Sequence, residues 1–356
     1  MPGINPELMA ELEHNHPFPD LEIGPGLIYP YYDGYSLVNL PGSICDWLGV
    51  PRLGAPPLKE ELAATLGRSF RHVILVVMDG IGLDRFLDIV QPPGDQAASP
   101  AWQRLLPRGT LGALTSIVPS TTSAALTSLW SGRTAVEHGI VGYEVWLKEY
   151  GLVANMITHS AAAFLGDSGG LRRAGFQPQS FLPVKTLGVH LAEHGIQPYA
   201  CMPVSIARSG LSTMQMAAVR IAAYHTLGEL WVSLGEQMRI RRANAPSYTY
   251  VYWGDLDSLS HRYGPGDERV RVDFESFSLL INYFVESMQG AGRGDTLLIV
   301  TADHGHIATY SNPAYELRRH PELLSHLAIP PTGENRLPYL FLKPGREDAI
   351  MRYVEK

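Results

Sequence analysis

Three runs of residues that each lead to an aspartate constrain the fold more than any other feature of the chain. Residues 73–78 have the sequence VILVVM and precede Asp79, residues 248–253 (YTYVYW) lead toward Asp257, and residues 296–301 (TLLIVT) lead toward Asp303. The first run is apolar throughout and the other two repeat its design, whereas a strand with one face in water alternates polar and apolar residues. We therefore expect strands that are buried on both faces of a parallel sheet.

Helical patterns separate these runs. Apolar residues in the stretch 277–288 recur at spacings of three and four, and residues 187–194 followed by 196–201 favour another helix and another strand of the same sheet. Strands that alternate with helices pair in parallel, because each helix carries the chain back across a face of the sheet. The sequence thus predicts an α/β fold with a doubly wound, mostly parallel central sheet and helices on both faces.

Composition shifts along the chain suggest its organisation. Residues 1–70 are rich in proline and glycine and predict an irregular segment packed on the core, and residues 71–356 predict one catalytic domain. Within that domain, residues 203–247 look mostly helical, so we expect a small helical insertion or lid beside the site.

The overall composition excludes several classes of protein. The net charge of −7 gives no basic surface for neutralising many phosphates, so a stable nucleic-acid complex is not expected. Cys45 and Cys201 are widely separated, which argues against a disulfide framework and favours a reducing cytoplasm. A signal-peptide pattern and a long apolar stretch are both missing, so we expect a protein that is neither exported nor held in a membrane.

Acidic residues follow all three predicted strands. Ligands of open α/β sheets bind at the carboxyl ends of the strands, so Asp79, Asp257, Asp303 and the adjacent His304 are expected to converge. A single aspartate after a strand is more often a turn former or a helix cap. Several carboxylates in one pocket, however, repel one another unless cations compensate their charge. Their convergence therefore predicts bound metal.

Two spacings indicate which metal to expect. Asp257 and His261 are four residues apart, so one helical turn directs both at one ion, although this pattern alone is a weak signal. Asp303 and His304 offer an oxygen and a nitrogen ligand on consecutive residues. Mixed nitrogen and oxygen ligands favour Zn²⁺, with manganese or iron as alternatives.

A cluster of hydroxyl residues precedes the predicted helix that starts near residue 124. Residues 118–123 have the sequence VPSTTS, and such a cluster most often only caps a helix. The same position also suits catalysis, because a helix N-terminus attracts phosphate and a bound metal favours the alkoxide form of a hydroxyl. The local pattern alone does not choose among Ser120, Thr121, Thr122 and Ser123.

Four sequence blocks together resemble the alkaline phosphatase superfamily, and within it the nucleotide pyrophosphatase/phosphodiesterase, or type I phosphodiesterase, branch. They are VVMDGIG around Asp79, VPSTTSAALTSLWSGRTAVEHGIVG around Thr122, DLDSLSHRYGP around Asp257, and VTADHGH around Asp303. In that branch the nucleophilic threonine lies three residues after a proline and ten before a glycine. Thr122 keeps both spacings, so the resemblance implies that Thr122 is the nucleophile and that a phospho-threonine intermediate forms.

The resemblance also implies an alkaline-phosphatase-like fold and two divalent metal ions. One ion would be held by Asp79, Thr122, Asp303 and His304. The other would be held by Asp257, His261 and a further histidine. We expect His320 as that last ligand, because its loop is free to fold back toward the site; His306 is the close alternative.

The expected function is hydrolysis of phosphodiesters or pyrophosphates, with a small phosphorylated substrate such as a nucleotide. Phosphonate hydrolysis and phosphomonoester hydrolysis are alternatives within the same superfamily, and a non-catalytic metal- or ligand-binding relic is an alternative from a different functional class. The branch usually carries an asparagine three residues after the nucleophile to hold a phosphoryl oxygen, and here that position is Ala125. The residues that bind substrate, the natural substrate and the oligomeric state therefore stay open.

Overall fold

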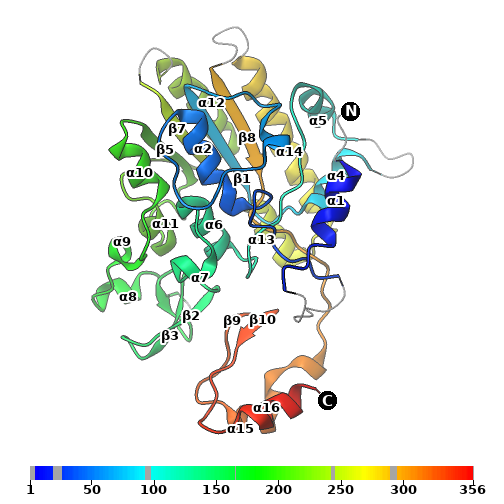
Figure 1. Cartoon of the computed structure of the whole chain (residues 1–356), viewed down its shortest axis with the longest axis vertical. Helices are drawn as coiled ribbons and strands as arrows, with labels where there is room; N and C mark the ends of the chain where they lie inside the picture. The colour runs from blue at the N-terminus through cyan, green and yellow to red at the C-terminus, as the bar shows by residue number, and fades with distance from the viewer. Residues whose placement is uncertain are drawn as a thin grey trace.

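A five-stranded parallel sheet forms the centre of the computed structural model, which describes residues 5–18, 26–92, 98–164, 166–241, 245–288 and 295–355. Its strand order is β6-β5-β7-β1-β8, and every neighbouring pair is parallel (Figure 1). The bounds are β1 His72–Met78, β5 Gln197–Pro203, β6 Arg220–Tyr224, β7 Ser247–Trp253 and β8 Thr296–Thr301. The parallel sheet predicted from the apolar runs is confirmed.

Strand β1 shows why a continuous apolar run was required. All seven of its residues are buried, and the six apolar side chains after His72 alternate between two separate cores. Val73, Leu75 and Val77 belong to one core, and Ile74, Val76 and Met78 belong to the other. Because successive side chains of a strand point to opposite faces, a polar residue at any of these positions would enter one of the two cores.

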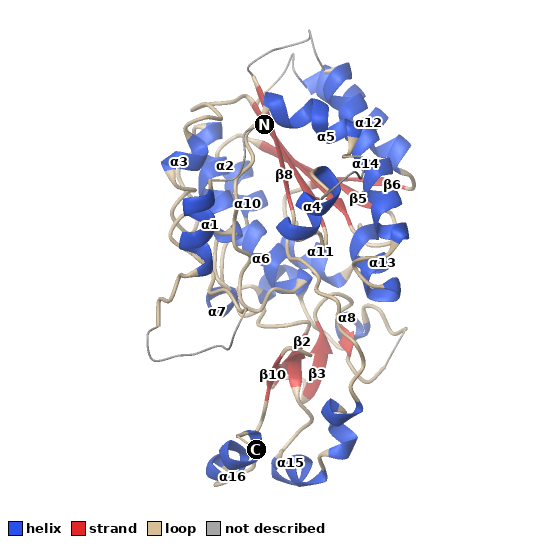
Figure 2. Cartoon of the chain, turned by 90° about the vertical axis from the view of Figure 1, so that its right-hand side faces the viewer, coloured by secondary structure: helices blue, strands red, loops and turns tan. Residues whose placement is uncertain are grey.

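Helices cover both faces of the sheet, as Figure 2 shows. One core receives apolar residues from α2 (Leu40–Leu48), α6 (Thr122–Ser131), α10 (Leu187–Glu193) and α11 (Gly210–Gln215). The other receives them from α4 (Leu83–Val90), α5 (Pro100–Leu105), α12 (Leu227–Arg241) and α14 (Glu268–Ser287). The predicted doubly wound arrangement, with helices on both faces, is confirmed.

The remaining helices are short or lie at the edges. They are α1 (Pro6–Glu13), α3 (Glu60–Ala63), α7 (Ala135–His138), α8 (Gly170–Arg173), α9 (Pro178–Phe181), α13 (Asp255–Tyr263), α15 (Pro321–His326) and α16 (Glu347–Val354), with 3-10 turns at Leu37–Asn39, Leu106–Arg108, Pro313–Tyr315 and Leu317–Arg319. None of the helices in the described part of the chain combines the length and the apolar composition that a membrane span requires.

A second, antiparallel sheet lies below the first in Figures 1 and 2 and was not anticipated from the sequence. Its strand order is β10-β9-β2-β3-β4. The bounds are β2 Glu144–Leu147, β3 Leu152–Asn155, β4 Ser160–Ala161, β9 Thr332–Glu334 and β10 Leu337–Tyr339. These strands are short, so their alternation spans too few residues to stand out in the sequence.

Two segments differ from what the sequence suggested. Residues 203–247, expected as a helical insertion or lid, contribute the edge strand β6 and the covering helix α12 to the central fold. Strand β6 was not recognised in the sequence because it lies at the edge of the sheet. Most of its residues are exposed, so it lacks the continuous run of buried apolar side chains that marks a central strand. Residues 1–70, expected to be irregular, include the buried helix α2, which packs on α6 and β1.

Candidate functional site

Three neighbouring strands of the central sheet, β7, β1 and β8, have their carboxyl ends side by side. Register pairs Met78 of β1 with Trp253 of β7, and Val77 of β1 with Thr301 of β8. Asp79 follows β1 directly, Asp303 lies two residues beyond the end of β8, and α13 begins immediately after the turn that follows β7. The carboxyl ends of β7, β1 and β8 thus bring together side chains that lie far apart in the chain.

The first cluster consists of Asp79, Asp303 and His304, whose possible ligand atoms all lie within 4.8 Å of one another. Nε2 of His304 lies 3.3 Å from Oδ1 of Asp79 and 3.8 Å from Oδ2 of Asp303. Nδ1 of His304 lies 3.2 Å from the Gly305 carbonyl oxygen, which favours a proton on Nδ1 and leaves the Nε2 lone pair facing the carboxylates.

The hydroxyl of Thr122 joins this cluster. Its Oγ1 lies 3.0 Å from Nε2 of His304 and 3.5 Å from each oxygen of Asp79. Thr122 is the first residue of α6, after the N-cap residue Thr121. The other hydroxyl residues are placed differently: Ser120 is exposed, and Ser123 is buried and donates to the Gly142 carbonyl oxygen at 2.9 Å. Of this group, the structure brings Thr122 to the carboxylates.

The electrostatics of the first cluster fit a bound cation. Burial, and then the charge of Asp303, raises the pKa of Asp79 well above its ordinary value. Burial raises the pKa of Asp303 to about 7, against the opposing hydrogen bonds that its Oδ1 accepts from the Gly80 and His304 amides at 3.2 and 2.9 Å. Oδ2 of Asp303 is buried and has no hydrogen-bond partner among the described residues. A cation would supply the missing partner and neutralise both carboxylates.

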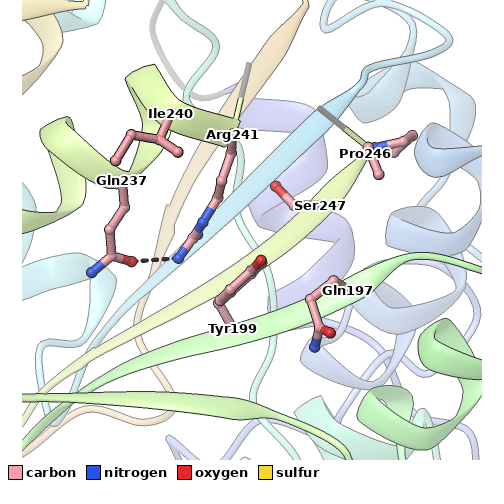
Figure 3. A pocket seen from close by; sticks show the side chains of 8 residues that line it. Gln197, Tyr199, Gln237, Ile240, Arg241, Pro246 and Ser247 are labelled. Atoms are coloured by element: carbon pink, nitrogen blue, oxygen red, sulfur yellow. Dashed lines mark hydrogen bonds between the residues drawn. The ribbon is translucent and has the colours of Figure 1, made fainter. Parts of the chain in front are cut away.

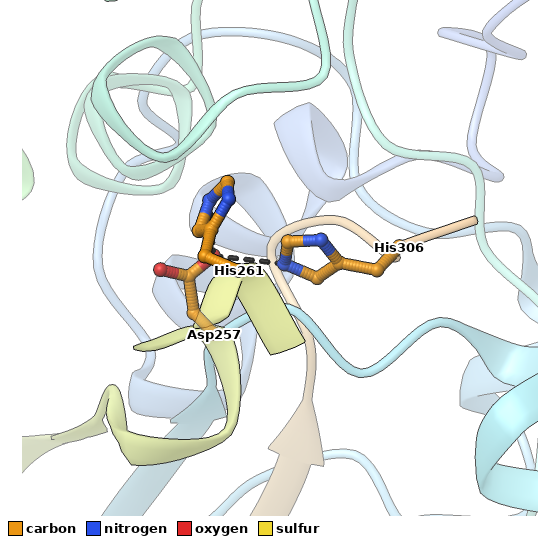
Figure 4. Close-up of side chains that lie close together, drawn as sticks. All are labelled: Asp257, His261 and His306. Atoms are coloured by element: carbon orange, nitrogen blue, oxygen red, sulfur yellow. Dashed lines mark hydrogen bonds and ion pairs between the residues drawn. The ribbon is translucent and has the colours of Figure 1, made fainter. Parts of the chain in front are cut away.

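The second cluster consists of Asp257, His261 and His306, shown in Figure 4. Oδ1 of Asp257 lies 2.9 Å from Nε2 of His306 and 3.4 Å from Nε2 of His261, one turn further along α13. Burial raises the pKa of Asp257, but the hydrogen bond from His306 and the nearby imidazoles outweigh burial and lower it overall. The donor set is one carboxylate and two imidazoles, which suits Zn²⁺.

Gly80 allows the two clusters to approach each other. A Cβ at this position would lie 2.8 Å from Nε2 of His306 and 3.1 Å from the Cα of Asp257, and the residue has a φ of +78°. Both the space and the left-handed backbone require glycine. The rings of His304 and His306 then lie 5.4 Å apart, so the two clusters are adjacent.

The expected last ligand, His320, is not brought to the site. Its Nδ1 lies 2.6 Å from the Tyr353 hydroxyl and its Nε2 lies 2.5 Å from the Ala314 carbonyl oxygen, so both ring nitrogens are engaged within the C-terminal helices. The loop folds onto α16 and away from the strand ends. His306, the alternative, lies 2.9 Å from Asp257, because it belongs to the short loop after β8 that also carries Asp303 and His304.

Several residues of the sequence motifs lie in the apolar core. Ala125 is fully buried there, so this position does not face a substrate. Tyr248, Tyr250 and Tyr252 pack in the same core. Sequence reasoning missed that the Tyr252 hydroxyl also donates a hydrogen bond to Oδ2 of Asp79. The contact depends on the register of β7 against β1, which pairs Tyr252 with Val77, two residues before Asp79, and no sequence pattern indicated this register.

A cavity of about 240 Å³ lies apart from this site, at the opposite, amino-terminal ends of β5 and β7 (Figure 3). Arg241 lines it and lies over the ring of Tyr199, 3.3 Å from the ring centroid, and it donates to Thr249 and Gln237. The Arg241 guanidinium is therefore engaged by the protein itself, and the cavity adds no group to the carboxylate clusters.

Comparisons with known proteins support one family. The family model described as type I phosphodiesterase/nucleotide pyrophosphatase matches residues 73–347. This is the family that the sequence motifs resembled, so that prediction is confirmed. No curated protein sequence matches the chain.

Two solved structures of one mouse protein share the fold. The murine ectonucleotide pyrophosphatase/phosphodiesterase 5 superposes with a TM-score of 0.56 at 16% identity, over 79% of this chain and 68% of that one. An inactive variant of the same mouse protein in complex with AMP gives a TM-score of 0.56 at 15% identity, with the same coverage. Phosphonoacetate hydrolase from Sinorhizobium meliloti gives a TM-score of 0.41 at 20% identity, over 65% of this chain and 55% of that one.

Proposed function

We propose, from the premise that the chain belongs to the type I phosphodiesterase/nucleotide pyrophosphatase family and is a hydrolase of that type, that it works through a phospho-threonine intermediate on Thr122 at a two-metal site. The observation that carries the proposal is the position of the Thr122 hydroxyl. Its Oγ1 lies at the start of α6, within 3.5 Å of Asp79 and 3.0 Å of His304.

The two side-chain clusters supply ligands for two divalent cations. We assign Asp79, Thr122, Asp303 and His304 to one cation, and Asp257, His261 and His306 to the other. Zn²⁺ is the proposed ion because both sets combine oxygen and imidazole nitrogen, and Mn²⁺ or iron is the alternative. When bound, such a pair of cations withdraws charge from a phosphoryl oxygen and lowers the pKa of a coordinated hydroxyl.

The protein's own groups set the geometry of the reaction. Thr122 Oγ1 forms the new bond to phosphorus, and the bond from phosphorus to the leaving oxygen breaks on the opposite side. The hydroxyl proton has two acceptors within reach as the bond to phosphorus forms, Nε2 of His304 at 3.0 Å and the Asp79 carboxylate at 3.5 Å. The backbone amides of the first turn of α6 would donate to the phosphoryl oxygens, because the first N–H groups of a helix have no partner within the helix. Water then attacks the phosphorus, the bond from phosphorus to Thr122 Oγ1 breaks, Oγ1 regains a proton from that water, and the phosphorylated product leaves.

The proposed substrate is a small phosphorylated molecule, with nucleotides as the first class to test. The mouse structural relative has been solved in complex with AMP, which makes nucleotide diesters and dinucleotide pyrophosphates reasonable first substrates. The cytoplasm is the proposed compartment, because Cys45 and Cys201 are both unpaired, buried thiols.

Replacing the nucleophile tests the proposal. Thr122→Ala should lower turnover of bis-p-nitrophenyl phosphate by at least about 10³-fold, because the attacking oxygen is lost. Metal content by mass spectrometry should remain near two ions per chain, since the other ligands stay in place. Thr122→Ser should retain part of the activity because it keeps the hydroxyl.

Ser120→Ala is the matched control, because Ser120 is an exposed hydroxyl residue two positions away. It should turn over like the wild type. Wild-type turnover by Thr122→Ala would overturn the nucleophile assignment, and a wild-type protein that binds no divalent cation would overturn the two-metal site.

A further inference from the structure

Tyr252 makes a polar contact within the apolar core, directly beneath the candidate site. Its side chain lies on β7 and is buried, with 7% of its surface exposed. Its hydroxyl donates a hydrogen bond to Oδ2 of Asp79. A buried phenol usually has a partner for its hydroxyl, but here the partner is one of the candidate metal ligands.

The sheet register places this hydroxyl. Tyr252 pairs with Val77 across β7 and β1, and Asp79 lies two residues after Val77. Side chains two residues apart share a face of a strand, so the Tyr252 ring extends along the sheet to the Asp79 carboxylate. The backbone of Tyr252 is held in turn, because the Tyr224 hydroxyl donates to the Tyr252 carbonyl oxygen at 2.8 Å.

The contact distinguishes the two oxygens of Asp79. Oδ2 accepts from Tyr252, whereas Oδ1 lies 3.3 Å from Nε2 of His304. A carboxylate held at one oxygen cannot rotate freely, so its other oxygen keeps a fixed direction toward the cluster. Such supporting hydrogen bonds commonly contribute 10-fold to 100-fold to the metal affinity of a site.

We propose that Tyr252 is a positioning residue that orients Asp79 toward the cation it shares with Asp303 and His304. This inference rests on the proposed two-metal function. It assigns to Tyr252 a role in metal affinity that is separate from its role in packing. The second cluster, at Asp257, makes no hydrogen bond with Tyr252, so its affinity for metal should not depend on the Tyr252 hydroxyl.

The same strand provides a matched control. Tyr250 is fully buried on the same face of β7, and its hydroxyl has no hydrogen-bond partner among the described residues. Tyr252→Phe and Tyr250→Phe each remove one buried hydroxyl and keep the ring. Only the first removes a contact with a candidate ligand.

The experiment is a calorimetric titration of the chelator-stripped full-length chain with Zn²⁺, for the wild type and both variants. We expect Tyr252→Phe to weaken one of the two Zn²⁺ sites about 10-fold and to leave the other unchanged. Tyr250→Phe should match the wild type at both sites. Thermal unfolding of the stripped proteins should show both variants folded, and turnover of bis-p-nitrophenyl phosphate should be measured alongside.

The outcomes separate this inference from the proposed function. Two unchanged Zn²⁺ affinities in Tyr252→Phe, in a wild-type background that binds two ions and turns over substrate, would overturn the positioning role alone. Equal weakening in Tyr250→Phe, or equal weakening of both sites, would assign the effect to packing and also overturn it. A wild type that binds no Zn²⁺ would overturn the proposed two-metal function together with this inference.

Discussion

Outside the candidate site, His159 is a buried histidine with an unusual backbone conformation. Its side chain is 1% exposed, its φ is +51°, and neither ring nitrogen has a hydrogen-bond partner among the described residues. The ring packs against Phe176, with the centroids 5.0 Å apart. Burial lowers the pKa of His159 to about 4, so the imidazole is neutral in the folded protein at neutral pH.

This burial makes folding stability depend on pH. In the unfolded chain a histidine binds a proton near pH 6.5, whereas folded His159 does so only near pH 4. The unfolded state therefore binds more protons between these values, so the stability contribution is complete above pH 6.5 and is lost as pH falls toward 4. Between pH 7 and pH 5 the loss should be about 2 kcal/mol.

The variant His159→Asn removes the titrating group and keeps a residue type that tolerates positive φ. Urea unfolding at pH 7 and pH 5 should show a smaller loss of stability in the variant than in the wild type. Part of the loss should persist in the variant, because burial also lowers the pKa of His138 to about 4. Equal losses in the two proteins would contradict the assignment to His159.

At the scale of elements, the loop after β8 decides how the second cluster is completed. The strand ends at Thr301, and Asp303, His304 and His306 follow within five residues. His306 reaches Asp257 at 2.9 Å, while His320 is held by Tyr353 of α16. His306 stays near the strand end because only a short loop separates it from β8. The longer segment that leads to His320 continues into the C-terminal helices.

Metal stoichiometry tests this distinction. His306→Ala should weaken or abolish binding of one of the two cations, because the second cluster would lose one of its three ligands. His320→Ala should leave both cations bound, although it removes a hydrogen bond to Tyr353. Mass-spectrometric metal content of the two purified variants measures the difference, and the reverse pattern would restore His320 as the ligand.

For the molecule as a whole, the small antiparallel sheet connects the C-terminal part of the chain with the segment that carries Thr122, the proposed nucleophile. Strand β9 pairs with β2, which begins two residues after Gly142. The Gly142 carbonyl oxygen accepts from Ser123, the neighbour of Thr122 at the start of α6. A Cβ at Gly142 would lie 2.7 Å from the Cα of Gly333, so the two backbones are in direct contact.

The variant Gly142→Ala should therefore disturb both the sheet and the position of Thr122, the proposed nucleophile. Because the colliding atoms are backbone, relief requires the strands to move, and overpacking of this kind costs about 1–3 kcal/mol. We expect lower stability in urea and lower turnover of bis-p-nitrophenyl phosphate. Gly109→Ala is the control, since a Cβ there meets no atom within 4 Å. Unchanged stability in Gly142→Ala would show that the contact with Gly333 yields easily.

The sequence alone determined the parts of this protein that depend on local pattern and on general rules of sheets. Continuous apolar runs specify buried parallel strands, and strand ends of one parallel sheet converge, so Asp79, Asp257, Asp303 and His304 were expected together. The choice of Thr122 among its hydroxyl neighbours came from the resemblance to the family and not from the local pattern. The strands could be predicted because apolar periodicity is a local property of the sequence and does not depend on contacts between distant segments.

Tertiary structure alone decided the choices that depend on where loops and edges fold. It placed His306 and not His320 at Asp257, made residues 220–224 an edge strand, and joined residues 332–339 to the strand at 144–147. It also brought the hydroxyl of Tyr252 to Asp79, across 173 residues of sequence. Such contacts arise from packing between distant segments, and several partners in the sequence satisfy the local pattern equally well.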